Sequence, residues 1–408
     1  MHINSGYESK ITSKIKNKRY LLQFLPKCIN HLSETKHINY YDKKLKSDYI
    51  IDIISNLLLK YYFKKENKFQ LNAEVLKLKY GYKYKSYIDY LLDNNIIYKL
   101  SDYKKGYKSR TYSLDKKVFK SDIKRYRNFD RVLLKKYKKR LIETIDNGKL
   151  NKIKDIVKSK LINDLFSVDI DLERAIFFLN AIDKKDIDLY NRNIYSAESI
   201  NNKHIFYHFD NYGRFHTNFT ILKGFIRKNC LLINGEETYE LDIQNSQPLF
   251  LAKLINESES KWVKQDELNF FKKLTNSGKF YDYLSASLKL KSRKKAKELT
   301  YKVLFGRNYY NSKHDIMFQR LFPTIYNFIK LYKKEHGDYK KLAWDLQGAE
   351  SDLIFNKIIF RIMDEHPEIK IITIHDSIII PEKYKQKAEK IFYEELKKEI
   401  KIEETLIK

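Results

Sequence analysis

Hydrophobic positions in the first third of the chain first recur at helical spacing and then alternate. Between residues 48 and 62 apolar side chains repeat every three or four positions, which predicts a helix. Asn72 can cap a short second helix, and a third is predicted from Lys83 to Asp93. Residues 96–100 and 111–114 then alternate as the strands of a hairpin do.

Three helices followed by a hairpin are the element order of a winged helix, and we expect such a module over residues 46–118. In that fold the third helix enters the major groove of DNA and the hairpin contacts phosphates. A small helical domain with an ordinary solvated hairpin is the alternative. The basic residues expected on a nucleic-acid surface are Lys83, Lys85, Lys104, Lys105, Lys108 and Arg110.

The flanking segments give less specific signals. Residues 1–45 are basic with short apolar stretches, and residues 119–204 repeat Leu and Ile at helical spacing, which predicts a helical, thumb-like region. Strands and helices both follow in residues 205–408, so the expected fold class is α+β. Acidic side chains cluster at Asp169, Asp171 and Glu173, but acids at a helix start favour a surface role over a metal site.

Two carboxylates in the second half sit at the ends of predicted strands. Residues 237–243 form one such strand, which ends near Asp242 and is followed by a helix with Pro248 in its first turn. Further on, apolar runs flank the short insert from His375 to Ser377, which contains Asp376. A turn-forming Asp and a structural His are the ordinary interpretation. A charged insert between buried strands is costly, however, unless it is paired or binds a metal ion.

Cations and aromatic residues share one face of a predicted helix. Arg293, Lys297, Tyr301 and Phe305 follow one another at steps of four, and Gly306 ends the helix. Two cations could hold a triphosphate while two rings stack on a base and sugar. With the two carboxylates, these are the components of metal-assisted nucleotidyl transfer.

Composition supports a polyanionic partner. The 408 residues include 81 Lys and Arg against 52 Asp and Glu, a formal charge of +29. A membrane surface is the main alternative, but no apolar run approaches the roughly 18 residues of a membrane span and the start lacks a signal-peptide core. We therefore expect a cytoplasmic protein without a membrane partner. Cys28 and Cys230 fit neither a disulfide framework nor a zinc site.

The motifs of residues 205–400 resemble those of the family A DNA polymerases and the related single-subunit phage-type RNA polymerases. Asp242, with Leu251 and Ala252 following, resembles motif A, and the helix from Arg293 to Gly306 resembles motif B. Residues 374–377 resemble motif C, in the form with Ser after Asp that the RNA polymerases have. The segments 212–216 and 347–352 are similar to the TGR and QGTAAD segments of the family.

The resemblance implies a polymerase right hand: a palm with an antiparallel sheet, embedded helical fingers at about 255–340, and a thumb. Asp242 and Asp376 would bind two Mg²⁺ ions, or Mn²⁺ in their place. The implied nucleotide-binding residues are Arg293, Lys297, Tyr301, Phe305 and Gln247, and the implied contacts to template and primer are Arg214, Gln347 and His375.

Two departures leave the sugar preference open. Gln247 occupies the position of the family's glutamate that blocks the ribose 2′-position, and Phe305 stands where Tyr is usual. The expected function is a monomeric, template-directed DNA polymerase or primase-polymerase of a phage, plasmid or mobile element. Its expected partners are DNA or RNA strands, nucleoside triphosphates and unidentified replication proteins. A phage-type RNA polymerase and a non-catalytic replication initiator on a polymerase-like scaffold are the alternatives.

Overall fold

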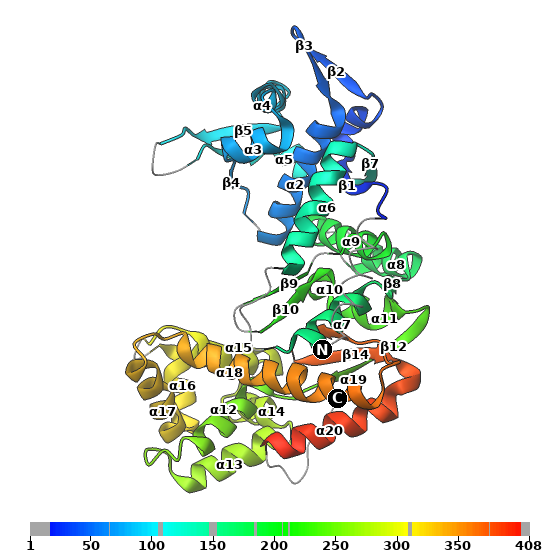
Figure 1. Cartoon of the computed structure of the whole chain (residues 1–408). Helices are drawn as coiled ribbons and strands as arrows, with labels where there is room; N and C mark the ends of the chain where they lie inside the picture. Colours follow the sequence, from blue (N-terminus) through cyan, green and yellow to red (C-terminus); the bar gives the residue numbers. More distant parts are fainter. Residues whose placement is uncertain are drawn as a thin grey trace.

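The computed structural model describes residues 17–64, 66–104, 109–146, 153–182, 186–205, 207–210, 213–308, 312–374 and 376–400. The chain is a mixed α+β protein with small antiparallel sheets (Figure 1). Its buried apolar residues form two cores, one from Leu21 to Leu133 and one from Ile153 to Leu396. The change of core therefore falls inside residues 119–204, which the sequence suggested as one helical region.

The first core begins with a strand that the sequence did not specify. In this segment β1 (Leu21–Pro26) pairs antiparallel with β7 (Ile123–Asn128), so the module between them is enclosed by its own flanks. A short 3₁₀ segment, η1 (Lys27–Ser33), and a hairpin of β2 (His37–Tyr40) and β3 (Lys43–Lys46) connect β1 to the first long helix. Pairing across about a hundred residues leaves no local pattern, which is why sequence reasoning missed it.

The elements predicted between residues 46 and 118 are present. They are α2 (Ser47–Lys64), β4 (Phe69–Gln70), α3 (Ala73–Tyr80), α4 (Tyr84–Asp93), β5 (Ile97–Ser101) and β6 (Thr111–Leu114). The Asn72 side chain caps α3 by accepting from the backbone N–H groups of Glu74 and Val75, at 2.8 and 3.2 Å. The small sheet has the order β4-β6-β5, so the chain adds one short strand to the predicted helices and hairpin.

The helices that follow lead from the first core into the second. They are α5 (Lys116–Phe119), α6 (Arg131–Asp146), α7 (Asp155–Leu165), α8 (Leu172–Ile182) and α9 (Ile187–Asn201). A strand, β8 (Val168–Ile170), lies among them and joins the central sheet. Asp171 bonds the backbone of Arg174 at 3.0 Å and Asp169 pairs with Lys203 at 2.6 Å, so these acids have the structural roles that the sequence favoured.

The central sheet has five antiparallel strands in the order β13-β14-β12-β11-β8. Its remaining strands are β11 (Leu231–Ile233), β12 (Glu236–Asp242), β13 (Ile372–Ile374) and β14 (Ser377–Pro381). Between β8 and β11 the chain also forms a hairpin of β9 (Tyr207–Phe209) and β10 (Phe215–Thr217), followed by α10 (Asn218–Ile221) and α11 (Gly224–Cys230). A short turn, η3 (Glu382–Tyr384), leads to α20 (Lys385–Ile400), which packs on β12 (Figure 1).

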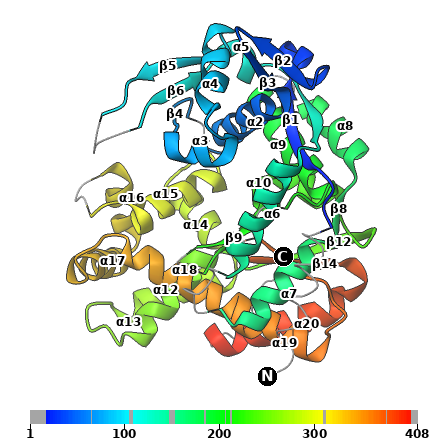
Figure 2. The same cartoon turned by 45° about the horizontal axis from the view of Figure 1, so that its top comes forward.

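The described residues between β12 and β13 form helices joined by short loops. In order they form α12 (Ser246–Glu257), α13 (Gln265–Asn276), α14 (Phe280–Ser287), α15 (Arg293–Phe305), α16 (Lys313–Leu321), α17 (Pro323–Glu335), α18 (Lys341–Ser351), the π-helical η2 (Asp352–Ile359) and α19 (Phe360–Glu365). The rings of Phe271 and Phe318 pack around Phe322, with centroids 5.1 and 5.5 Å away. This aromatic centre holds α13, α16 and α17 together, and Figure 2 shows these helices on one side of the molecule.

Among the described helices, none combines the length and the apolar character needed to cross a membrane.

Candidate active site

The central sheet brings Asp242 and Asp376 together. β12 ends at Asp242, which is paired in register with Ser377, the first residue of β14. Asp376 directly precedes β14, and its carbonyl oxygen accepts from the backbone N–H of Ile243 at 3.4 Å. Since the strands are antiparallel and adjacent, two carboxylates that are 134 positions apart in sequence lie at the same end of this strand pair.

Both carboxyl groups have raised pKa values. Burial raises the pKa of Asp242 to about 6, and the neighbouring carboxylates of Glu240 and Glu350 add to the rise. Burial also raises the pKa of Asp376 well above its ordinary value, with Glu350 and Asp242 adding to it. Beyond burial, these shifts reflect several acids around one point, whose charge Lys297 opposes only in part.

Lys297 is the cation that opposes these shifts at both acids. Among the described residues, no Lys or Arg forms an ion pair with either Asp242 or Asp376. Two adjacent carboxylates that lack a protein cation are the donor set that a hard divalent cation prefers, so the residues present fit Mg²⁺ or Mn²⁺. A group of three or more His, Cys, Asp or Glu in metal-binding geometry does not occur in the described part of the chain.

The helix α15 carries the predicted face of cations and rings. Ser292 caps its start by accepting from the Lys295 N–H at 3.4 Å, and the helix ends before Gly306, as predicted. A Cβ at Gly306 would lie 2.3 Å from the Lys302 carbonyl oxygen, so a larger residue could not close the helix in this way. The Lys297 ammonium lies 5.4 Å from the centre of the Tyr301 ring. The Phe305 ring follows, 5.2 Å from that of Tyr301.

Arg293 lies at the exposed start of α15. Its guanidinium pairs with Asp282 at 3.4 Å and lies 5.4 Å from the centre of the Tyr281 ring. It also donates to the side-chain oxygen of Asn245 at 3.4 Å, which connects α15 to the turn that follows β12. Burial raises the pKa of Tyr301, and the charge of Asp376 contributes to that rise, so Tyr301 lies close to Asp376.

A third carboxylate, Glu350 of α18, belongs to the site and was missed by sequence reasoning. It is only 2% exposed and accepts hydrogen bonds from three side chains. The donors are Arg214 at 3.2 Å, Ser246 at 2.5 Å and Gln247 at 2.5 Å. The available signal was its position: it follows Leu346 by four residues and precedes Leu353 by three, which places an acid on the buried face of a helix.

The contacts of Glu350 locate two of the predicted site residues. Arg214, expected at the template and primer, is paired with Glu350 beside α12, and Gln247, expected at the nucleotide sugar, donates to the same carboxylate. Within the described residues, Arg214 Nε, Asn245 Nδ2 and Gln247 Oε1 are buried polar atoms without a hydrogen-bond partner. Since buried polar atoms are rarely left unsatisfied, these atoms indicate a place where a polar ligand completes the hydrogen bonding.

The remaining predicted residues fall into three groups. Gln347 is half-buried on α18, one turn before Glu350. Lys83, Lys85, Lys104 and Arg110 are exposed on the first core, whereas the carboxylate pair lies in the second. Three predicted residues lie outside the described residues: Lys105, Lys108 and His375.

Comparison with known proteins does not assign this site to a family. No protein-family model matches the chain, and a search of curated proteins found no significant match.

Proposed function

We propose that the chain is a template-directed nucleotidyltransferase, a compact DNA polymerase or primase-polymerase with a right-hand arrangement of palm, fingers and thumb. One observation carries the proposal: Asp242 and Asp376 meet at the end of adjacent antiparallel strands, close to Glu350 and without an ion-paired cation among the described residues. Lys297 and Tyr301 of α15 support it, because the charge of Lys297 acts on both carboxylates and the charge of Asp376 acts on Tyr301.

In the proposed reaction the 3′-hydroxyl of a primer attacks the α-phosphorus of a nucleoside triphosphate, and pyrophosphate leaves. Asp242 and Asp376 would hold the divalent cations, which when bound supply charge neutralisation at the attacking and leaving oxygens. Lys297 and Arg293 lie on the exposed side of α15, where ammonium and guanidinium groups neutralise a triphosphate. Tyr301 and Phe305, in ring contact, offer a surface for the base and sugar.

Glu350 would act as a positioning residue in this reaction. Its two oxygens hold Arg214 on one side and Ser246 and Gln247 on the other. The start of α12 is thereby fixed next to Asp242, with the Asn245 amide and the Gln247 carbonyl left to meet a substrate. A buried carboxylate with three donors keeps this geometry more rigidly than separate exposed contacts could.

The N-terminal module would bind duplex nucleic acid. Its elements have the winged-helix order, with Lys83 and Lys85 exposed at the start of α4 and Arg110 exposed beside β6. Cations at these positions contact phosphates, which favours binding that weakens strongly with salt.

The direct test is primer extension with Mg²⁺ by the whole chain and by Asp376→Asn. Reactions contain deoxynucleotides or ribonucleotides, with and without a primer, on single-stranded DNA and RNA templates. The expected result is extension by the wild type and a loss of at least about a thousandfold in the variant, since the metal site supplies several kcal/mol of transition-state stabilisation. Equal activity in both proteins, or no activity of the wild type on any template, would contradict the proposal.

A further inference from the structure

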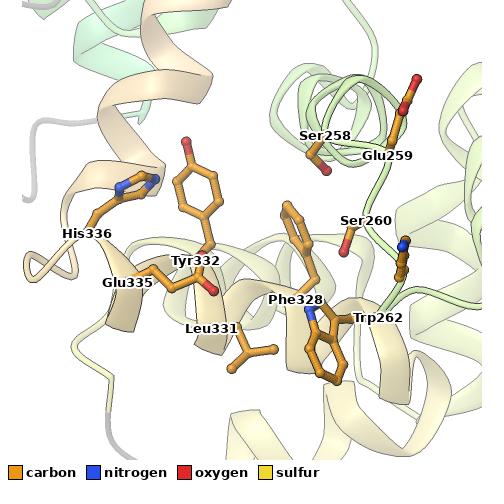
Figure 3. Close-up of a pocket in the computed structure, with 10 residues that line it drawn as sticks. Ser258, Glu259, Ser260, Trp262, Phe328, Leu331, Tyr332, Glu335 and His336 are labelled. Atoms are coloured by element: carbon orange, nitrogen blue, oxygen red, sulfur yellow. The ribbon is translucent and has the colours of Figure 1, made fainter.

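A pocket of about 400 Å³ opens in the helical region that follows β12, and its lining includes none of the candidate active-site residues (Figure 3). One wall is the loop after α12, residues 258–262, and the other is the second half of α17 with His336. The rings of Trp262, Phe328 and Tyr332 come from these two elements and face the same hollow. A pocket of this size takes a ligand larger than one side chain.

The aromatic walls are held in place but incompletely covered. Tyr332 donates to Asp345 at 2.7 Å and its ring lies 5.7 Å from that of Phe328, which fixes its orientation. Trp262, in contrast, is 70% exposed. Glu259, in the same loop, has a φ of 46°, a left-handed conformation that costs a non-glycine residue energy. The loop therefore keeps a large apolar ring at the surface in a strained backbone.

The charges around the pocket favour a cationic ligand. Glu259 and Glu335 lie at its two sides, and neither forms an ion pair with any residue that the structure describes (Figure 3). This is notable in a chain with 81 Lys and Arg. Lys261 is the one lysine or arginine among the lining residues, and His336 packs edge-on against Tyr332. Aromatic faces with two carboxylates attract an ammonium or guanidinium group and repel phosphates.

We propose that this pocket binds an arginine or lysine side chain of a partner protein, together with an apolar neighbour in the same peptide segment. The cation stacks on the aromatic faces and pairs with Glu259 and Glu335, and the apolar neighbour covers Trp262. The proposal is independent of the proposed nucleotidyl transfer, because none of its residues belongs to the candidate active site.

The test is a selection of random 12-residue peptides displayed on phage against the whole chain. The variants are Trp262→Ala and the double variant Glu259→Gln/Glu335→Gln, with Phe177→Ala as the matched control. Phe177 lies on α8 and is 69% exposed, so its removal changes a similar apolar area elsewhere. The most enriched peptide is then synthesised with its basic residue intact and, for an arginine, as neutral citrulline. Thermal melting of each variant verifies folding, since all the replaced side chains are exposed.

The expected peptides carry Arg or Lys beside Leu, Ile or Phe. Such a peptide binds Trp262→Ala at least tenfold more weakly than it binds the wild type or Phe177→Ala. Replacing its cation weakens binding to the wild type but leaves binding to the double Gln variant nearly unchanged, as two interacting partners require. Selection of acidic peptides, equal selection by wild type and Trp262→Ala, or a Trp262-dependent binding of a single-stranded oligonucleotide would each overturn the proposal.

Discussion

One buried acid of the first core and two half-buried acids of the second have opposite surroundings. In the first core Asp52 is 3% exposed, and it accepts from Tyr80 and Gln23 at 2.5 Å and pairs with Lys79 at 2.6 Å. In the second core Asp242 and Asp376 have raised pKa values, and neither forms an ion pair with a described Lys or Arg. The carboxylate of Asp52 is hydrogen-bonded and ion-paired by side chains of the protein itself. The carboxylates of Asp242 and Asp376 have no ion-pair partner among the described Lys and Arg residues, which leaves their charge for a bound cation to neutralise.

This difference in partners distinguishes a structural acid from a functional one. A buried carboxylate with a full set of donors stabilises the fold, whereas one that faces other carboxylates destabilises it. A chain retains the second kind where the acids do chemical work, at a cost in stability. The predictions below use this contrast, beginning with the largest expected effect.

Asp52→Ala should lower the free energy of unfolding by roughly 3–5 kcal/mol, because it leaves Lys79 and the hydroxyl of Tyr80 without their acceptor in a buried setting. The measurement is urea unfolding at pH 7, followed by circular dichroism. Asp155→Ala is the control, because Asp155 is an exposed acid in an ion pair with Lys158 and its loss should cost less than about 1 kcal/mol. A similar fall in the free energy of unfolding in both variants would show that the buried acid Asp52 stabilises the fold no more than an exposed acid does.

Asp242→Asn should have the opposite sign and raise the free energy of unfolding at pH 7 by on the order of 2 kcal/mol. The folded state holds a proton on Asp242 up to a pKa of about 6, whereas the unfolded chain releases it near 3.8. Stability of the wild type therefore falls as the pH rises between those values, and the variant lacks this fall. The measurement is the same unfolding series, without divalent cations, from pH 4 to pH 7. Destabilisation by Asp242→Asn at pH 7 would show that its environment is not electrostatically unfavourable.

Glu350→Gln tests the role of the third carboxylate of the site, which the sequence did not predict. Glu350 raises the pKa of both Asp242 and Asp376, so its neutralisation should move the rise of primer-extension activity with pH toward lower pH. The hydrogen bonds from Ser246 and Gln247 can persist with an amide oxygen, whereas the ion pair with Arg214 is lost, so thermal melting is used to verify that the variant folds. The readout is the pH at half-maximal rate in the wild type and variant. A lower rate with an unchanged pH profile would assign Glu350 a purely structural role.

The smallest effect is expected at the module surface. Lys83→Ala and Lys85→Ala should each weaken duplex binding and lower the salt slope by about 1, because each removes one phosphate contact. Substitution is preferable to deletion of the module, since α2 packs against β1 and α9 and its loss would expose the first core. Fluorescence anisotropy at several salt concentrations gives the slope. A slope equal to that of the wild type in both variants would exclude α4 from the interface.

Sequence pattern predicted those parts of the fold that depend on local spacing. The cap and end of α3, the end of α15 at Gly306, the hairpin of β5 and β6, and the strands next to Asp242 and Asp376 follow from periodicity and turn chemistry. The pairing of β1 with β7 could not be predicted, because the two strands are far apart in the chain and each is short. The same holds for the contact of Arg214 with Glu350, which joins two elements 136 residues apart.

The most direct measurement is Mn²⁺ binding followed by electron paramagnetic resonance, in the wild type, Asp242→Asn and the exposed-acid control Asp155→Asn. If Asp242 and Asp376 lack protein cations because they bind divalent ions, the wild type and the control bind Mn²⁺ alike. Asp242→Asn then binds it at least tenfold more weakly while remaining folded. Unchanged Mn²⁺ affinity in Asp242→Asn, or no saturable binding by the wild type, would contradict the account.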